Sequence, residues 1–234
     1  MITSQELDEL NQTYETAHPT EILQWAAENF WPNIAASSSF QTQGLPLLHM
    51  LHQVAPEMPI IFIDTGYHFP QTLAFRDRMV HEWGLNLQIA RATLTKTQLQ
   101  QQYGSEPYRL NPDMCCYVNK VLPMKEAMRG LTAWISGIRR DQSLSRSKTR
   151  VLEVTADGVL RIHPMANWSE REVWQYIHEH NLPEHPLLAE GFMSIGCAPC
   201  TRPVFDGEDS RSGRWTGQAK TECGLHTVLR SWKT

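Results

Sequence analysis

The chain has 234 residues, of which 41% are hydrophobic, and this is enough to build one well-buried core. Its formal net charge of −4 excludes a global attraction to polyanions, so we expect neither a nucleic-acid partner nor binding to an anionic membrane. The sequence has no basic leader followed by an apolar run and no apolar stretch of about 20 residues, so we expect a cytoplasmic protein without a membrane span. Any anionic ligand is then expected to be small.

The first elements are helical. Apolar residues recur at helical spacing from Gln5 to Phe30 and are interrupted near Pro19, which predicts two helices with Thr20 as the N-cap of the second. Short apolar runs then alternate with helical patterns, as in parallel βαβ units. We therefore expect an α/β fold with a mainly parallel, twisted sheet flanked by helices. The strands are expected to begin at 34, 59, 85 and 133, and the later helices to cover 45–54, 71–83 and 169–180.

Polar and basic residues follow three of the predicted strands. Ser37 to Ser39, Asp64 to Gly66 and Arg139 to Arg140 all come directly after apolar runs. Ligands of such folds collect at the carboxyl ends of the strands, so these segments are expected to meet at one site.

The end of the chain differs in composition. Residues 205–219 are rich in glycine, serine and charge, which is typical of a mobile linker. We therefore expect one α/β domain over residues 1–204 and a mobile tail over residues 205–234.

The five cysteines are expected to be ligands or catalytic thiols, because a reducing compartment disfavours disulfides. Cys115 and Cys116 are adjacent, and Cys197 and Cys200 form a second pair. Four thiolates can hold an iron-sulfur cluster or a tetrahedral zinc ion. Adjacent cysteines are unusual in zinc ribbons, which favours a cubane cluster, while zinc and buried core thiols stay open as alternatives.

Cys223 lies far from both pairs. A catalytic thiol must reach its thiolate form, which nearby positive charge favours. Glu222 opposes this form, whereas a surrounding basic group favours it, namely Arg211, Arg214, Lys220 and His226. An incidental surface cysteine is the alternative.

Two further groups are candidates for anion binding. The serines 37–39 precede a predicted helix, where hydroxyls and backbone N–H groups can cradle an anion, although the loop lacks the ending of a Walker A motif. Arg139, Arg140, Arg146 and Lys120 adjoin the strand ends and the first cysteine pair. Arginine forks match phosphate or sulfate oxygens, but a solvated basic face is an equal alternative.

Four motifs together resemble one known family along nearly the whole chain. They are Ser37-Ser38-Ser39-Phe40, Ile63-Asp64-Thr65-Gly66-Tyr67, Gly137-Ile138-Arg139-Arg140-Asp141-Gln142 and Glu222-Cys223-Gly224-Leu225-His226. This set is similar to the assimilatory adenylyl-sulfate and phosphoadenylyl-sulfate reductases. The two cysteine pairs resemble the cluster-bearing branch, which reduces adenosine 5'-phosphosulfate.

The resemblance implies an adenine nucleotide α-hydrolase-like fold, a [4Fe-4S] cluster on the four paired cysteines, and thioredoxin as reductant. Cys223 would attack the sulfur of the phosphosulfate, release AMP and become an S-sulfocysteine, from which thioredoxin would free sulfite. By motif position, the residues that contact the nucleotide would be Ser37, Ser38, Ser39 and Thr65. The phosphosulfate would be held by Lys120, Arg146, Arg211 and Arg214, with Arg139 also among the substrate-binding residues. The oligomeric state stays open, a homo-oligomer included.

The chain departs from the cluster-bearing pattern in its phosphate loop. That branch often has Ser-Phe-Ser-Gly, whereas this chain has Ser-Ser-Ser-Phe-Gln-Thr-Gln, which is closer to the branch that uses the 3'-phosphorylated substrate. Reduction of the 3'-phosphorylated form is therefore an alternative. Two other classes are weaker rivals: an ATP-dependent nucleotidyl or thiolation enzyme with zinc, against which the missing glycine-rich loop argues, and a zinc-stabilised nucleic-acid-binding module, against which the negative charge argues.

Overall fold

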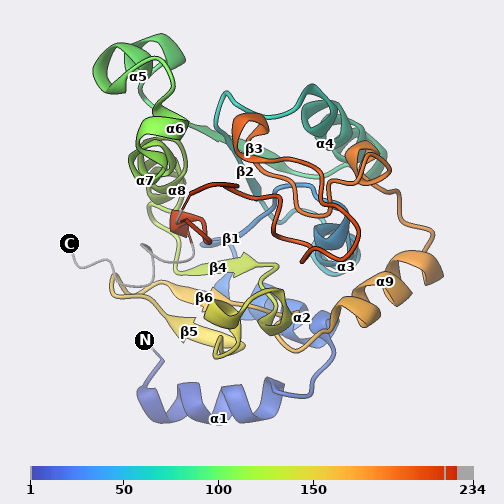
Figure 1. The fold of residues 1–234 in the computed structure, drawn as a ribbon. Helices are drawn as coiled ribbons and strands as arrows, with labels where there is room; N and C mark the ends of the chain where they lie inside the picture. The colour runs from blue at the N-terminus through green and yellow to red at the C-terminus, as the bar shows by residue number, and fades with distance from the viewer. Residues whose placement is uncertain (1, 219, 226–234) are drawn as a thin grey trace.

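A six-stranded sheet forms the centre of the computed structural model, which describes residues 2–218 and 220–225 (Figure 1). The strand order is β3-β2-β1-β4-β6-β5, and all neighbouring pairs are parallel except β5 and β6. The strands are β1 (Ile34–Ser37), β2 (Ile60–Asp64), β3 (Leu87–Arg91), β4 (Ala133–Ser136), β5 (Leu152–Val154) and β6 (Leu160–Ile162). The expected α/β class with a mainly parallel sheet is confirmed.

Helices cover both faces of this sheet. Those before β4 are α1 (Ser4–Tyr14), α2 (Pro19–Phe30), α3 (Leu45–Val54), α4 (Pro70–Trp83), α5 (Lys96–Tyr103), α6 (Pro107–Leu110), α7 (Pro112–Cys116) and α8 (Leu122–Ala127). A π-helical turn, Tyr117–Val121, joins α7 to α8, and α9 (Glu170–Glu179) follows the sheet. Ser169 caps α9 through the expected capping box with Glu172.

Alternation along the strands divides the core into two parts. Ala36 of β1 and Ile135 of β4 face the larger part, into which α2, α3 and α4 bury their apolar sides. Ala35 and Trp134, their neighbours in sequence, face the opposite part, where α8 contributes Met124. Because both faces are covered at the centre of the sheet, β1, β2 and β4 are almost continuously apolar, as buried parallel strands usually are.

Several sequence predictions need correction at element ends, among them the second strand, which begins at Ile60 and not at 59. The N-cap of α2 is His18 and not Thr20, because Pro19 occupies the first helical position, where its missing N–H costs nothing. The third strand begins at Leu87 and not at 85, since Leu85 ends the turn after α4 and its N–H bonds the Val80 carbonyl. Helix α4 begins at Pro70, one residue earlier than predicted.

The sheet reverses its winding between β1 and β4. These strands are adjacent and in register, so that Ser37 pairs with Ser136, although the chain first runs outward through β2 and β3 before it returns to β4. Ligands in open α/β sheets bind at such a switch point, beyond the carboxyl ends of the strands. The loops after β1 and β4 therefore meet where the sequence predicted, whereas Asp64 to Gly66, at the end of β2, do not line the cavity at this point.

Candidate active site

A cavity of about 280 Å³ opens at this switch point. Its walls come from the loop after β1, the loop after β4 and the C-terminal part of the chain. A space of this size suits a single small molecule. Every predicted substrate-binding residue except Thr65 lines it, namely Ser37, Ser38, Ser39, Lys120, Arg139, Arg146, Arg211 and Arg214.

The three serines are oriented by local hydrogen bonds. Ser37 Oγ accepts a bond of 2.8 Å from Trp134 Nε1, and Ser38 Oγ accepts one of 3.0 Å from the Phe40 N–H. Ser39 Oγ accepts from Gln41 Nε2 at 3.0 Å. Because a hydroxyl both accepts and donates, each serine keeps an O–H for a ligand oxygen. The α-helix begins at Leu45, as predicted, and a 3₁₀ turn over Thr42–Gly44 separates it from the serines.

The structure separates the two adjacent arginines. Arg139 is 2% exposed, donates to Asp141 at 2.9 Å and to Gln43 at 3.1 Å, and leaves Nη1 buried without a hydrogen-bond partner among the described residues. Arg140 points away and pairs with Glu15, after the end of α1. Arg139 is thus a candidate hydrogen-bond donor to an anion in the cavity. Arg140 instead links the sheet to the segment that follows α1.

A second, smaller cavity brings the two cysteine pairs together. Its lining includes Cys115, Cys116, Cys197 and Cys200. The first pair comes from the end of α7, and the second pair flanks a 3₁₀ turn, so the chain delivers four thiols to one place from two distant segments. Four soft sulfur donors in one pocket suit zinc or an iron-sulfur cluster.

Thr65 belongs to this second cavity and not to the first. It is 5% exposed, and its Oγ1 lies 3.3 Å from Cys197 Sγ. The sequence comparison of motifs implied contact with the nucleotide, but the structure places this hydroxyl against a predicted metal ligand.

Burial disfavours the thiolate form of the paired cysteines. It raises the pKa of Cys115, with Cys197 adding to the effect, and raises the pKa of Cys200 to about 11. Thiolates in such a place need a cation, and metal binding would release their protons. Within residues 2–218 and 220–225, no three His, Cys, Asp or Glu side chains are arranged to hold one metal ion.

Lys120 and Arg214 stand between the two cavities, since both line each of them. Burial opposes the charge of Lys120, but Cys197, Cys223 and Cys116 raise its pKa above the ordinary lysine value. Burial lowers the pKa of Arg214, and Cys223 is the largest opposing influence. Two cations are thus held between the paired cysteines and the fifth one.

Cys223 lines the larger cavity. A hydrogen bond from Cys116 lowers its pKa well below the usual thiol value, and the charges of Lys120 and Arg214 act in the same direction against burial. Of the basic group predicted around Cys223, Arg214 acts on the thiol and Arg211 pairs with Glu222, while Lys120 was not part of that prediction. Lys220 instead pairs with Asp113, and His226 lies outside the described residues.

The C-terminal segment is attached to the cysteine turn. Arg214 forms an antiparallel bridge with Thr201, and the Trp215 N–H donates to the Cys200 carbonyl at 3.0 Å. Trp215 is 3% exposed, and the Arg214 guanidinium lies 4.5 Å from its ring centroid. The sequence analysis missed Trp215, although a tryptophan inside a glycine- and serine-rich run is a signal of such an anchor.

The absence of a side chain at Gly196 leaves room for the Arg214 guanidinium. A Cβ added at this glycine would lie 2.2 Å from Arg214 Nη2 and 2.5 Å from its Cζ. The guanidinium therefore lies directly over the glycine backbone, and Nη1 donates to the Ile195 carbonyl at 3.2 Å. Gly196 is not among the residues predicted from the sequence, because close approach by a distant side chain leaves no local pattern.

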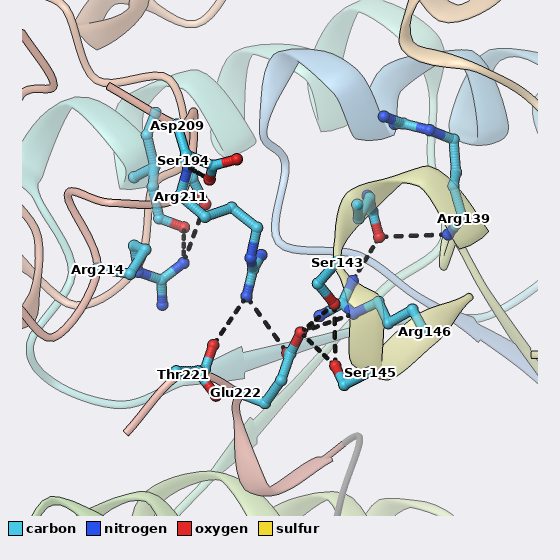
Figure 2. Close-up of polar contacts among 12 residues, drawn as sticks. Arg139, Ser143, Ser145, Arg146, Ser194, Asp209, Arg211, Arg214, Thr221 and Glu222 are labelled. Atoms are coloured by element: carbon cyan, nitrogen blue, oxygen red, sulfur yellow. Dashed lines mark hydrogen bonds and ion pairs between the residues drawn. The ribbon is translucent and has the colours of Figure 1, made fainter. Parts of the chain in front are cut away.

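The two arginines Arg146 and Arg211 share one partner. Glu222 accepts from Arg146 Nη2 at 2.7 Å and from Arg211 Nη2 at 3.2 Å, and Ser143 and Ser145 also donate to it (Figure 2). The negative charge that opposes the Cys223 thiolate in the sequence is thus neutralised by this pairing.

A mainly parallel sheet with a switch-point cavity, and a half-buried cysteine beside two cations that line it, are the features of an enzyme of the adenine nucleotide α-hydrolase-like fold. A Candida glabrata FMN adenylyltransferase structure shares that fold, with a TM-score of 0.56 at 13% identity over 97% of this chain and 82% of its own. The match is much stronger with a phosphoadenylyl-sulfate reductase of Candida auris in complex with phosphate. Its TM-score is 0.76 at 30% identity, over 85% of this chain and 97% of that one.

The model of the phosphoadenosine phosphosulfate reductase domain matches residues 33–203. An adenosine 5'-phosphosulfate reductase of Streptomyces coelicolor is 40% identical over 91% of this chain and 89% of its own length. A phosphoadenosine 5'-phosphosulfate reductase of Gloeobacter violaceus is 42% identical over 94% of this chain and 93% of its own. The chain therefore belongs to the adenylyl-sulfate and phosphoadenylyl-sulfate reductase family, and it is an oxidoreductase of that kind. None of its described helices has the length and apolar character to cross a membrane.

Proposed function

We propose that this chain reduces adenosine 5'-phosphosulfate to sulfite and AMP, with Cys223 as nucleophile, thioredoxin as reductant and the cytoplasm as its compartment. The observation that carries the proposal is the place of Cys223. It lines the cavity at the switch point together with Lys120 and Arg214, and those two cations also line the cavity of the four paired cysteines. A nucleophile, its activating charges and an anion-binding space thus occur in one site.

The first step transfers the sulfuryl group. The Cys223 thiolate attacks the sulfur, a bond forms between the two sulfur atoms, and the bond from sulfur to the phosphate oxygen breaks, which releases AMP. Both reactants are anionic, so the cations must offset their repulsion, and this is the role we assign to Lys120 and Arg214. Arg139, with an unpartnered buried nitrogen, and the hydroxyls of Ser37, Ser38 and Ser39 would hold the nucleotide.

The second step returns the cysteine. A thiol of thioredoxin attacks Cys223 Sγ and displaces sulfite, and the second thioredoxin thiol then frees Cys223 and closes a disulfide. Two electrons pass from the dithiol to the sulfur that leaves as sulfite. We assign residues 205–234 to a tail that must open for this step, whereas residues 1–204 form the substrate-binding domain.

We assign a [4Fe-4S] cluster to Cys115, Cys116, Cys197 and Cys200. Each of the four sulfurs would bind a different iron, so they need not converge on one point, as they must around tetrahedral zinc. The direct adjacency of Cys115 and Cys116, which is unusual in zinc ribbons, supports the cluster over zinc. When bound, the cluster would hold the two cysteine segments together and contribute to the electrostatic field at Lys120.

Reduction of the 3'-phosphorylated substrate is the second candidate. It is supported by the Gln-Thr-Gln sequence after Phe40 and by the Gloeobacter violaceus relative. Both substrates should be offered separately at equal concentration with thioredoxin, and their kcat/KM values compared. A larger value for the unphosphorylated form supports the first proposal, and a larger value for the 3'-phosphorylated form supports the second. No sulfite from either substrate, in protein prepared without oxygen, would contradict both.

A further inference from the structure

Glu222 is a buried carboxylate directly before the proposed nucleophile. It is 7% exposed, and the described residues surround it with donors from two segments. Ser143 Oγ lies 2.8 Å and Ser145 Oγ 3.2 Å from Oε1, and Arg146 Nε lies 3.1 Å from the same oxygen. Oε2 accepts from Arg146 Nη2 at 2.7 Å and from Arg211 Nη2 at 3.2 Å. A buried charge is costly unless it is satisfied in this way.

Arg146 is committed to this contact. Its Nε and Nη2 both bond Glu222, and its Nη1 bonds Gln142 Oε1, so all three guanidinium nitrogens lie on protein oxygens. The planar fork meets the carboxylate with two nitrogens, which fixes orientation as well as distance. The side chains of Arg146 and Glu222 are 9% and 6% exposed, so water screens the pair only weakly.

The donors to Glu222 come from two separate parts of the chain. Ser143, Ser145 and Arg146 belong to the loop after β4, whereas Arg211 belongs to the C-terminal segment (Figure 2). Arg211 also donates to the Thr221 carbonyl at 3.4 Å, next to the carboxylate residue itself. The carboxylate thus ties the residue before Cys223 to the wall of the cavity and to its own segment.

We propose that Glu222 is a positioning residue that holds Cys223 in the cavity beside Lys120 and Arg214. Arg146 and Arg211 would act on Cys223 through Glu222. This rests on the proposed function, because it takes Cys223 as the nucleophile of sulfuryl transfer. It differs from the motif-based assignment, in which Arg146 and Arg211 hold the phosphosulfate. The pKa of Glu222, which burial would raise, is instead lowered by Arg146 and Arg211, so the carboxylate is charged at neutral pH.

The matched pair of variants is Glu222→Gln and Glu208→Gln. Glu208 lies in the same segment and pairs with Arg202 at 2.8 Å, but both side chains are 31% exposed and neither lines the cavity. Three quantities are compared: substrate affinity at equilibrium, the single-turnover rate of AMP release, and the rate at which iodoacetamide labels Cys223 in the resting protein. Glu222→Asp keeps the charge and provides a folded test if the glutamine variant does not fold.

For Glu222→Gln we expect AMP release to slow by about 10- to 100-fold with substrate affinity changed less than about twofold, because the nucleophile and not the substrate is misplaced. Labelling of Cys223 should accelerate severalfold as the half-buried cysteine moves away from the cavity wall. Arg146→Met should have the same effects, and the double variant should be no slower than either single one, because both remove one contact. Glu208→Gln should match the parent protein.

A parallel loss of substrate affinity and rate in Arg146→Met, with Glu222→Gln unaffected, would overturn the proposal and return Arg146 to the substrate. Equal labelling of Cys223 in the parent, Glu222→Gln and Glu222→Asp would also overturn it. Failure of the proposed function looks different: the parent protein would release no AMP from either substrate, while the labelling difference between Glu222→Gln and Glu208→Gln would persist.

Discussion

Replacement of Gly196 by alanine tests whether the position of Arg214 matters for the reaction. The new Cβ would lie 2.2, 2.5 and 2.9 Å from Nη2, Cζ and Nε of Arg214. An ordinary non-bonded separation is about 3.5 Å, so the guanidinium must retreat by about 1.3 Å. The atoms that must move end a long side chain, and the backbone at Gly196 has no left-handed φ that alanine would resist. We therefore expect the fold to persist and the charge to shift.

A displacement of about 1 Å at a reacting centre costs roughly 100-fold in rate, which corresponds to about 2.7 kcal/mol of transition-state stabilisation. The assay is the single-turnover release of AMP, measured for Gly196→Ala in the parent and in an Arg214→Ala background. In the parent background we expect AMP release to slow by the full factor of roughly 100. In the second background the clash has no partner, so the further loss should be less than about twofold.

Equal losses in the two backgrounds would refute the reasoning, since the glycine would then act on something other than Arg214. Unchanged activity of Gly196→Ala would refute it as well, because the electrostatic role of Arg214 would then not depend on its place.

Three further predictions concern the cluster, Lys120 and the dependence of stability on pH. Cys200→Ser should lower the iron and sulfide content measured after anaerobic purification, whereas an iron-poor parent protein with stoichiometric zinc would contradict the cluster. Lys120→Met should reduce AMP release by about 100-fold while the cluster stays in place, as judged by the same iron analysis, because a cation facing the transferred anion is lost. His185 is 1% exposed, and its Nε2 lies 3.0 Å from Thr72 Oγ1 while Nδ1 accepts from the Leu187 N–H, so burial lowers its pKa to about 4. The unfolded chain then binds more protons between about pH 4 and pH 6.5, and the free energy of unfolding should fall by about 1.4 kcal/mol from pH 7.5 to pH 5.5 through this group. The free energy of unfolding should be measured in urea at both pH values for the parent and for His185→Gln. It should fall less in the variant than in the parent, and an equal fall in both would exclude His185 as the cause.

Much of the fold could be predicted because its signals are local. The alternation of strands and helices follows from hydrophobic periodicity, and the capping box of Ser169 and Glu172 needs only four residues. The start of β3 could not be placed, because Leu85 is as apolar as the strand residues and only its hydrogen bond to the Val80 carbonyl assigns it to the turn. Residue type alone predicts Thr20 as the N-cap of α2, whereas Pro19 at the first helical position makes His18 the N-cap.

The site was predicted as a list of residues but not as a set of partners. Strand ends collect ligands by topology, so the serines after β1 and Arg139 after β4 were expected to meet. The division of Arg139 from Arg140 depends on Glu15, more than 100 residues away, and no spacing reveals it. Thr65 likewise lies against the paired cysteines and not against the larger cavity, because its hydroxyl contacts Cys197, which is distant in sequence.

The arrangement of charge explains why so many cations surround one thiol. The proposed site must hold an anionic substrate, a thiolate and a buried carboxylate within one cavity, and an excess of negative charge there would exclude the substrate. Arg146 and Arg211 neutralise Glu222, so Lys120 and Arg214 stay available to the thiolate and to the transferred group, and Arg139 to the nucleotide. If Glu222 were neutral from the start, Arg146 would present an unpaired buried cation that could hold the product as well as the substrate. Because the Glu222 carboxylate takes up the charge of Arg146 and Arg211, the cations left to the substrate and the thiolate in this cavity are Lys120, Arg139 and Arg214.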